Sequence, residues 1–512
     1  MNLHQRSAGV LLHITSLPGP HGSGDLGPDA FRFVDWLSSA GQRIWQVLPN
    51  TPIGPGNSPY QSVSAFAGNP LMVAFEPLID AGWLPEPDSP AEGFKPGRID
   101  FDTVEPWRLA QLRLAAEGFF GSATEAQRAE LMDWCATQAH WLDDYTLFMA
   151  LQVLHHGLPW WDWPRPLRDR EPDAMADAVR THADELNFWR FVQWNFDRQW
   201  AALKAHANSK DVSILGDLPI FIAHHSADCW SRPDLYELDA NSQPTVVAGV
   251  PPDAFSSDGQ RWGNPLYRWD RMAAENYPWW CARVRRALTH ADGFRIDHFR
   301  GFAAYWAVPA SAQTAIEGHW VLGPGKNLFD ALIREIGHLP IIAEDLGLIT
   351  PDVTALRDAC GFPGMRVLQF AFGGDANNIY LPHHHTPLSV VYTGTHDNDT
   401  TRGWWQNVSE NERAFATEYL DSRSEIHWAM IRAACNSVAN TALFPMQDVL
   451  GLDGSTRMNM PGSSEGNWAW RFEWPTVDAR ATLRLHRATV ASGRGRLALL
   501  ESDGRAAAVV AT

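Results

Sequence analysis

The sequence has few cysteines, and their spacing suits neither a metal site nor a disulfide framework. The five are Cys135, Cys229, Cys281, Cys360 and Cys435. The closest two, Cys229 and Cys281, lie 52 positions apart (281 − 229), whereas zinc sites and small disulfide-rich folds use much shorter, paired spacings. We therefore expect reduced thiols in a cytoplasmic protein that needs no metal ion or other cofactor.

Long hydrophobic runs and excess positive charge are also missing. No stretch approaches the ~18 apolar residues of a membrane-spanning helix, and the apolar stretch from Gly9 to Leu12 is too short for a signal peptide. The chain carries 41 Lys and Arg against 59 Asp and Glu, a net charge of -18. Nucleic acids and anionic membranes attract basic surfaces. The composition therefore predicts no nucleic-acid or membrane partner, and it is compatible with a neutral substrate.

Tyrosine is scarce, but tryptophan is abundant: 9 tyrosines stand against 25 tryptophans. Most of these indole rings are expected to pack in the core. A protein that binds sugars also has a use for flat apolar faces that carry an N–H donor at the edge. The excess of tryptophan is therefore compatible with a carbohydrate ligand.

Eight short hydrophobic stretches alternate with helical patterns along the chain. They begin at Val10–Leu17, end at Ala442–Met446, and centre near residues 12, 46, 214, 295, 342, 368, 391 and 444. Eight strand–helix units predict an α/β protein with a TIM (β/α)8 barrel spanning residues 1–512. Large insertions are predicted after strands 2 and 3: a mainly helical one over residues 70–210 and a loop-rich one over residues 222–276.

A glycine motif after the first predicted strand resembles a dinucleotide-binding loop. Gly22, Gly24 and Gly27 form a literal GxGxxG ahead of a helix. However, Pro28 removes an N–H donor where a pyrophosphate would sit, and Val47–Asn50, about 20 residues further on, offers no acid for a ribose. The motif alone is a weak signal, and the sequence does not favour a nucleotide site.

The stretch DGFRIDHFRG, residues 292–301, contains the first candidate catalytic group. In a strand, Arg295 and Asp297 share one face because side chains alternate with period 2. An aspartate beside an arginine commonly has a lowered pKa, so we expect Asp297 to be ionised, as a nucleophile requires. A structural ion pair at a strand end would have the same pattern.

Other carboxylates follow other predicted strands: Asp217 the third, Glu344 the fifth and Asp397 the seventh. Catalytic groups of TIM barrels lie at the C-terminal ends of the strands, and gathering acids there is costly because like charges repel. Clustered carboxylates without metal-ligand spacing suit glycosidic bond chemistry. Glu344 has no cation beside it in sequence, so we expect it to carry the proton. Asp397 is placed to hold ring hydroxyls.

Two histidine clusters have simpler explanations than metal binding. His224 and His225 precede Asp228, but this set lacks a complete group of ligands. Hydrogen bonding within a polar loop accounts for it better. His383, His384 and His385 are read as a solvated loop. No metal site is predicted.

Eight stretches together resemble the 4-α-glucanotransferases called amylomaltases or disproportionating enzymes, in the α-amylase clan. They occur in order over almost the whole chain: SLPGPHGSGDLG (16–27), SPYQSVSAFAGNP (58–70), GDLPIFIA (216–223), VAGVPPDAFSSDGQRWGNPLY (247–267), GFRIDHFRG (293–301), IIAEDLG (341–347), YTGTHDNDT (392–400) and NMPGSSEGNW (459–468). The glycine motif becomes part of the first of these stretches. The resemblance implies transfer of α-1,4-glucan segments between maltooligosaccharides.

The resemblance also implies roles for individual residues in a retaining double displacement. Asp297 would be the nucleophile, Glu344 the acid/base and Asp397 the transition-state stabiliser, with Arg295 orienting the nucleophile. The residues expected to bind the glucan are Tyr60, Asp217, Asp253, Trp262, His298, His396 and Asn467. The family's loop at Gly249–Gly263 would cover the groove and exclude water, which protects the glucosyl-enzyme from hydrolysis.

One departure from the family pattern is Ala254, where an aromatic residue is expected, so the ratio of transfer to hydrolysis is left open. An α-glucan hydrolase and a catalytically inactive glucan-binding protein are the alternative functions. The complete trio Asp297, Glu344 and Asp397 argues against the inactive protein. The sequence does not define the preferred chain length, the formation of cyclic products or the oligomeric state.

Overall fold

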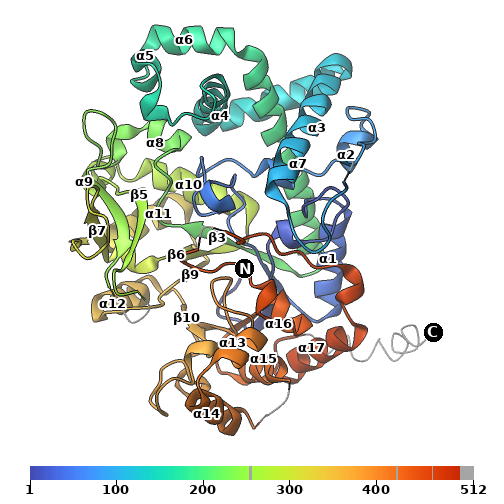
Figure 1. Cartoon of the computed structure of the whole chain (residues 1–512), viewed down its shortest axis with the longest axis vertical. Helices are drawn as coiled ribbons and strands as arrows, with labels where there is room; N and C mark the ends of the chain where they lie inside the picture. The colour runs from blue at the N-terminus through green and yellow to red at the C-terminus, as the bar shows by residue number, and fades with distance from the viewer. Residues whose placement is uncertain (91, 253–255, 422–424, 464, 496–512) are drawn as a thin grey trace.

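Eight parallel strands close into a barrel, as the sequence predicts (Figure 1). The computed structural model describes residues 1–512 except 91, 253–255, 422–424, 464 and 496–512. In chain order the barrel strands are β1 (Ser7–Leu11), β2 (Ile44–Gln46), β3 (Ser213–Pro219), β6 (Gly293–Asp297), β9 (Ile341–Ala343), β10 (Gly364–Val367), β11 (Ser389–Tyr392) and β12 (Thr441–Pro445). Each strand pairs with the next, and β12 pairs with β1, so the C-terminal ends of all eight meet at one mouth.

Two strands end earlier than their hydrophobic patterns predict. The first was expected over Val10–Leu17, but it ends at Leu11, and Ile14–Ser16 form a 3-10 helix. The sixth was expected to be centred near residue 368, but it ends at Val367 and is followed by another 3-10 turn. In both places buried apolar residues continue past the strand, among them Ile14 and Leu368. Hydrophobicity therefore marks burial here and not extended backbone.

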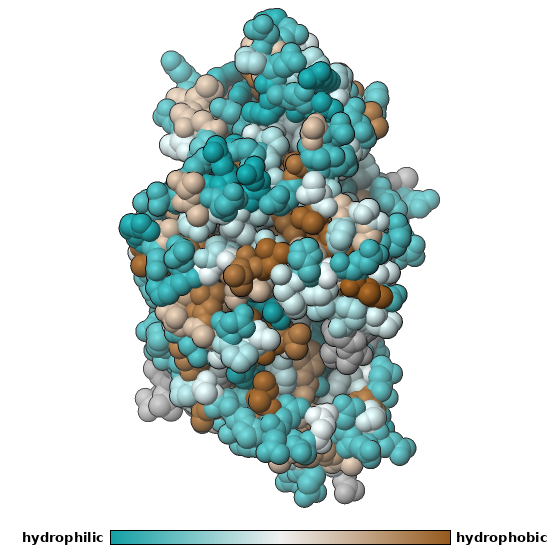
Figure 2. Space-filling model, turned by 90° about the vertical axis from the view of Figure 1, so that its left-hand side faces the viewer, coloured by the Kyte–Doolittle hydropathy of each residue, from teal (hydrophilic) through white to brown (hydrophobic). Residues whose placement is uncertain are grey.

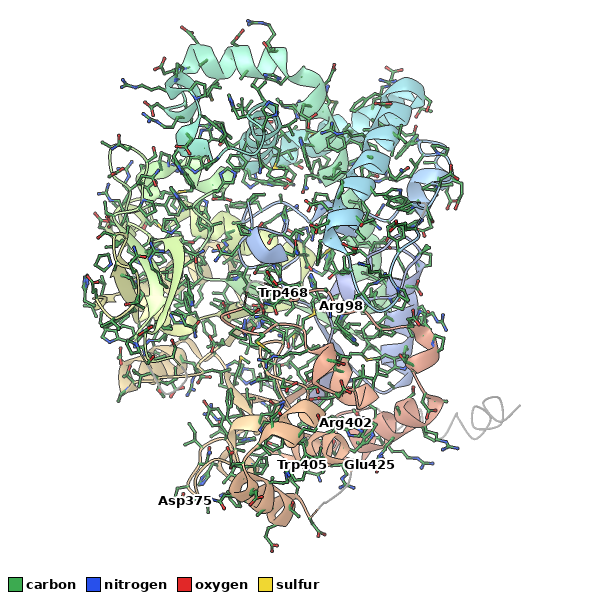
Figure 3. The ribbon with its side chains drawn as sticks, viewed as in Figure 1. Arg98, Asp375, Arg402, Trp405, Glu425 and Trp468 are labelled. Atoms are coloured by element: carbon green, nitrogen blue, oxygen red, sulfur yellow. The ribbon has the colours of Figure 1, made fainter. Side chains whose placement is uncertain are left out.

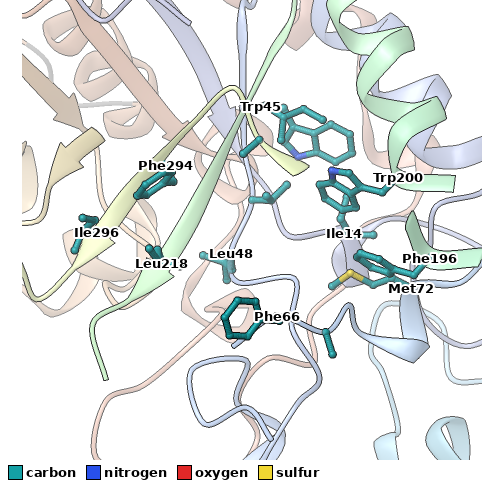
Figure 4. Close-up of a cluster of buried hydrophobic side chains, with 14 of the residues drawn as sticks. Ile14, Trp45, Leu48, Phe66, Met72, Phe196, Trp200, Leu218, Phe294 and Ile296 are labelled. Atoms are coloured by element: carbon teal, nitrogen blue, oxygen red, sulfur yellow. The ribbon is translucent and has the colours of Figure 1, made fainter. Parts of the chain in front are cut away.

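Helices surround the barrel and bury their apolar faces against it. Those that pack around it include α1 (Pro28–Ser39), α7 (Ala183–Ser209), α10 (Pro278–His290), α11 (Lys326–Ile336), α12 (Pro351–Cys360), α15 (Ile426–Asn436), α16 (Met446–Leu450) and α17 (Ala479–Ala491). Helix α1 begins at Pro28, whose fixed φ suits a first helical position. Figure 4 shows Phe196 and Trp200 of α7 beside Trp45 of β2, all buried in the layer between helix and barrel.

A helical region separates β2 from β3 and occupies the top of Figure 1. Its helices are α2 (Glu76–Asp80), α3 (Phe101–Ser122), α4 (Glu125–Leu154), α5 (Arg165–Arg168) and α6 (Pro172–Thr181), which lead into α7. Helix α4 begins with a capping box in which Thr124 and Gln127 satisfy each other's backbone N–H groups. Helices α4 and α7 pack along each other, which fixes this region to the barrel.

A second, antiparallel sheet stands beside the barrel on the left of Figure 1. Its order is β5-β4-β7-β8, from β4 (Val246–Val250), β5 (Gln260–Pro265), β7 (Ala304–Pro309) and β8 (His319–Leu322). The region expected to be loop-rich, residues 222–276, thus contains two strands and the short helices α8 (Ala227–Ser231) and α9 (Trp269–Ala274). The hydrophobic pattern does not predict this sheet because its strands are short and two of them, β4 and β5, contain a glycine.

The face that carries this sheet is turned toward the viewer in Figure 2, where separate hydrophobic patches lie across the middle between hydrophilic ends. Trp320 and Leu322 of the edge strand β8 are among the exposed large hydrophobic residues of the protein. The remaining helices, α13 (Thr401–Asn407) and α14 (Glu410–Leu420), lie at the bottom of Figure 1. Among the described residues, no helix has the length and apolar character needed to span a bilayer.

Candidate active site

Arg295 joins two of the predicted carboxylates at the mouth of the barrel. The pairing of β3 with β6 sets Asp217 opposite Arg295. Arg295 Nη1 donates to both oxygens of Asp217, at 2.9 and 3.0 Å, and to Asp297 Oδ1 at 2.9 Å, while Nη2 donates to the same Oδ1 at 2.7 Å. The guanidinium is buried, so water does not weaken these charge-assisted bonds. Arg295 therefore fixes the position of Asp297.

The expectation of a lowered pKa for Asp297 is wrong. Burial raises the pKa of its carboxyl to about 6, and the charges of Asp217 and Asp397 act in the same direction, against Arg295. Desolvation of the charged form outweighs one neighbouring cation here. A carboxyl with a pKa of about 6 is still mostly ionised at pH 7, so the predicted protonation state holds.

Glu344, directly after β9, retains its proton more strongly. Burial raises its pKa to about 7, and the neighbouring charge of Asp297 adds to the rise. Its Oε2 accepts from the backbone N–H of His298 at 2.7 Å and its Oε1 from that of Leu346 at 2.9 Å. His298 has a left-handed backbone with φ 53°, a conformation that non-glycine residues adopt mainly where the surroundings enforce it. That turn aims the N–H of His298 at Glu344.

Asp397 follows β11 and is held from the stretch after β12. Asn459 Nδ2 donates to Asp397 Oδ1 at 2.6 Å, and Arg457 Nη2 donates to the Asp397 carbonyl oxygen. His396 Nε2 lies 3.3 Å from the same Oδ1. The side chain of Asp397 is 41% exposed, whereas that of Asp217 is fully buried. Asp397 therefore faces the space where a ligand would lie.

Tyr60 links the two sides of this mouth. Its hydroxyl donates to Asp217 Oδ2 at 2.8 Å and lies 2.9 Å from His396 Nε2. The rings of Tyr60 and His396 stack at 9°, with their centroids 5.3 Å apart. A continuous set of hydrogen bonds thus runs from Asp297 through Arg295, Asp217 and Tyr60 to His396.

Two tryptophans border the carboxylates. Trp262 of β5 meets the ring of His298 edge-on, with centroids 4.8 Å apart, and Trp468 lies 5.7 Å from the ring of Tyr60. Asn467 hydrogen-bonds to the backbone of its own loop, accepting from the Met460 N–H at 2.9 Å. Figure 3 labels Trp468 and Arg98 near the middle of the molecule, where Arg98 Nη2 donates to the Gly466 carbonyl. Asn467 therefore orders the loop that presents Trp468.

The structure brings most of the predicted residues together. Asp217, Arg295, Asp297, Tyr60, His396 and Asp397 form one hydrogen-bonded group, and Glu344 and Trp262 join it through His298. Asp253, like Ala254, lies outside the described residues. Sequence reasoning did not single out Arg457, Asn459 or Trp468. The family motif could have identified two of them, because Asn459 and Trp468 are the first and last residues of the stretch NMPGSSEGNW.

The histidines considered as metal ligands have other partners. His224 stacks on Trp161 at 3.9 Å and its Nε2 hydrogen-bonds to the Ser242 carbonyl, while His225 Nδ1 accepts from the Trp160 N–H. Asp228 accepts from the Ala65 N–H. Within the part of the chain that the structure describes, no group of three or more His, Cys, Asp or Glu is placed to hold a metal ion.

Comparison with known proteins gives consistent matches over nearly the whole chain. Residues 12–477 match the family described as 4-alpha-glucanotransferase, glycoside hydrolase family 77. The 4-alpha-glucanotransferase of Thermus thermophilus is 49% identical over 91% of this chain and 95% of its own length, and that of Synechocystis is 45% identical over 92% and 94%. The amylomaltase of Streptococcus agalactiae, solved in complex with acarbose, superimposes with a TM-score of 0.93 at 36% identity, over 96% of this chain and 100% of that one.

Proposed function

The chain belongs to the 4-alpha-glucanotransferase family, glycoside hydrolase family 77, and from this premise we propose which residues perform the reaction. The protein is a 4-α-glucanotransferase, which moves segments of α-1,4-glucan from a donor maltooligosaccharide to the 4-hydroxyl of an acceptor glucan or glucose. The family works by a retaining double displacement through a covalent glucosyl-enzyme. Asp297 is the nucleophile, Glu344 the acid/base and Asp397 the transition-state stabiliser.

The arrangement around Arg295 supports these roles most directly. Both of its bonds to Asp297 end on Oδ1, which leaves Oδ2 as the oxygen that attacks the anomeric carbon. Glu344, with the higher pKa of the pair, gives its proton to the leaving glycosidic oxygen. The donor fragment departs, and the glucosyl group stays bonded to Asp297.

The second displacement reverses these steps. The hydroxyl of an acceptor sugar attacks the glucosyl-enzyme, where a hydrolase would use water. Glu344, now ionised, takes the proton of the acceptor's 4-hydroxyl, whose oxygen attacks the anomeric carbon and releases Asp297. Asp397 accepts hydrogen bonds from ring hydroxyls, which strengthen as the sugar acquires oxocarbenium character. Its orientation comes from Asn459.

The substrate is an α-1,4-glucan, and the residues proposed to bind it lie at the same mouth, except Asp253, which is outside the described residues. Tyr60, Trp262, His298, His396, Asp253 and Asn467 are proposed to contact the glucan or to shape its groove. Asp217 acts through Arg295 and Tyr60, because its side chain is fully buried and both oxygens accept bonds from these residues. Residues 70–210 are proposed as a mainly helical insertion within the barrel, and residues 222–276 as an insertion that covers the groove.

The cellular setting follows from composition and substrate. With a net charge of -18, the protein is proposed to act on maltodextrins without a nucleic-acid or membrane partner. Its scattered cysteines, expected to be reduced, are the ground for proposing the cytoplasm. Neutral glucans do not require a basic surface.

Incubation with maltotriose tests the function and the nucleophile together. Transfer gives glucose and longer maltodextrins, hydrolysis gives only shorter products, and an inactive binding protein leaves maltotriose unchanged. Asp297→Asn is expected to abolish transfer and hydrolysis. The matched control is Asp133→Asn on the exposed surface of α4, which is expected to retain full activity. Transferase activity in Asp297→Asn would overturn the assignment of the nucleophile.

A further inference from the structure

His13 is a fully buried histidine at the mouth of the barrel that the reaction above does not use. It follows β1 and is 4% exposed. Its Nδ1 has no hydrogen-bond partner among the described residues, and burial, together with the nearby ring of His396, lowers its pKa to about 3. A buried ring nitrogen without a hydrogen-bond partner costs free energy of folding, so the atoms that surround His13 bear on its role.

A cavity of about 20 Å³ has both His13 and His396 in its lining. His13, Ser16, Thr395, His396, Asn398 and Gln447 are among the residues that line it. That volume accommodates about one water molecule, which needs two to four polar partners. The cavity therefore has both the size and the polar lining of a site for a single water that touches His13 and His396.

The hydrogen bonds on the other side of His396 determine which of its nitrogens carries the proton. The Tyr60 hydroxyl has one proton, and it goes to Asp217, which accepts bonds on both oxygens. The 2.9 Å contact between Tyr60 and His396 Nε2 then requires Nε2–H to be the donor. Burial lowers the pKa of His396, which favours the neutral ring, and with its proton on Nε2 such a ring has an acceptor at Nδ1, on the side away from Tyr60.

We propose that His13 is a positioning residue: through one water in this cavity it gives the His396 tautomer with the proton on Nε2 a second support, beside the one from Tyr60. A buried N–H without an acceptor costs more free energy than a buried lone pair without a donor. Because His13 Nδ1 has no partner, the favoured tautomer of His13 has its proton on Nε2. His13 Nε2–H donates to the water oxygen, and the water donates one hydrogen to His396 Nδ1. The single hydrogen on His396 Nε2 thereby stays on the side of Tyr60 and Asp397, where it is shared between the Tyr60 oxygen and a sugar oxygen.

This inference rests on the proposed role of His396 at the reacting sugar. Without the bridge, the alternative tautomer places the proton on Nδ1 and turns a lone pair toward Tyr60 and Asp397. A lone pair facing the Asp397 carboxylate is repulsive and offers the sugar no donor. The loss falls on the transition state, because the sugar contacts tighten there.

Two substitutions separate positioning from packing. His13→Gln supplies a side-chain N–H at a similar reach, whereas His13→Leu fills the space without a donor. We expect the transfer kcat of His13→Leu to fall roughly fivefold, the equivalent of one net hydrogen bond, with KM and Tm little changed. His13→Gln should stay within about twofold of wild type.

The structural readout is the tautomer itself. Ring ¹⁵N spectra of the wild type and His13→Gln should show His396 protonated on Nε2, and crystal structures should show one water between the two positions. In His13→Leu, we expect the water to be lost and the Nδ1–H form to appear. Equal losses of kcat in both variants, or an unchanged tautomer in His13→Leu, would overturn the proposal. Asp297→Asn tests the proposed function independently, because its outcome does not depend on His13.

Discussion

Arg295 and Asp297 lie two residues apart on β6, and the guanidinium places two hydrogen bonds on a single carboxylate oxygen, Oδ1, at 2.9 and 2.7 Å. The same guanidinium also donates hydrogen bonds to both oxygens of Asp217. A planar fork with several donors is needed for both contacts. The geometry thus makes Arg295 the common support of the proposed nucleophile, Asp297, and of the hydrogen bonds that lead to His396.

Arg295→Lys should therefore damage catalysis although it preserves the charge. A lysine cannot hold Asp217 and Asp297 in the same way, so we expect kcat/KM for maltotriose to fall by about 100-fold or more. The pKa of Asp297 should rise as the cation's contact weakens, which moves the acid limb of the pH profile to higher pH. Steady-state kinetics across pH 5–9 measure both effects, and an unshifted acid limb would contradict the role in ionisation.

The wild-type enzyme should show a bell-shaped dependence of kcat/KM on pH. Activity needs Asp297 ionised and Glu344 protonated; their pKa values, raised mainly by burial, are about 6 and about 7. Activity is therefore expected to fall as pH drops below about 6 and as it rises above about 7. The Glu344→Gln variant can be tested with a sugar donor whose leaving group needs no proton, such as an α-glucosyl fluoride. With this donor, kcat/KM of the variant should no longer fall at alkaline pH. A retained alkaline limb there would assign it to another group.

The barrel and the grouping of carboxylates at its mouth follow from the sequence because each depends on local patterns. Period-2 alternation on β6 predicts that Arg295 and Asp297 share a face, and barrel topology predicts that Glu344 and Asp397 meet them. The raised pKa of Asp297 does not follow, because desolvation depends on residues packed around it from other strands. The bond from Asn459 to Asp397 spans 62 positions, and no local pattern encodes it.

Asn459 is therefore expected to matter although it is not one of the catalytic carboxylates. Asn459→Ala removes the amide that donates to Asp397 Oδ1 at 2.6 Å, a charge-assisted bond worth about 1.5–3 kcal/mol. We expect kcat to fall by roughly 10- to 100-fold with Tm nearly unchanged. Asn241→Ala, in an exposed turn, is the control. Wild-type kcat in Asn459→Ala would show that Asp397 is oriented by other contacts.

A buried ion pair in the outer layer provides a separate prediction about stability. Asp197 of α7 accepts from Arg286 of α10 at 2.7 and 2.8 Å and hydrogen-bonds to His290 at 3.0 Å. Burial opposes ionisation, but Arg286 and His290 hold the pKa of Asp197 well below its usual range. A carboxyl with a depressed folded-state pKa stabilises the fold above its unfolded-state pKa of about 4, and this stabilisation is lost as pH falls through the folded-state value.

Asp197→Asn should accordingly destabilise the protein at pH 7 by about 3 kcal/mol, because it leaves the buried Arg286 without its counter-ion. The difference between variant and wild type should shrink as pH drops below about 4, since the wild-type pair then loses its advantage with respect to the unfolded chain. Denaturant unfolding at pH 7 and pH 3.5 measures this difference in the free energy of unfolding, with Asp133→Asn as the exposed control. Because Asp197 lies between helices and not at the barrel mouth, folded Asp197→Asn should transfer glucosyl groups with wild-type kcat. A large loss of kcat with little loss of stability would instead connect this pair to the catalytic strand β6 through α10.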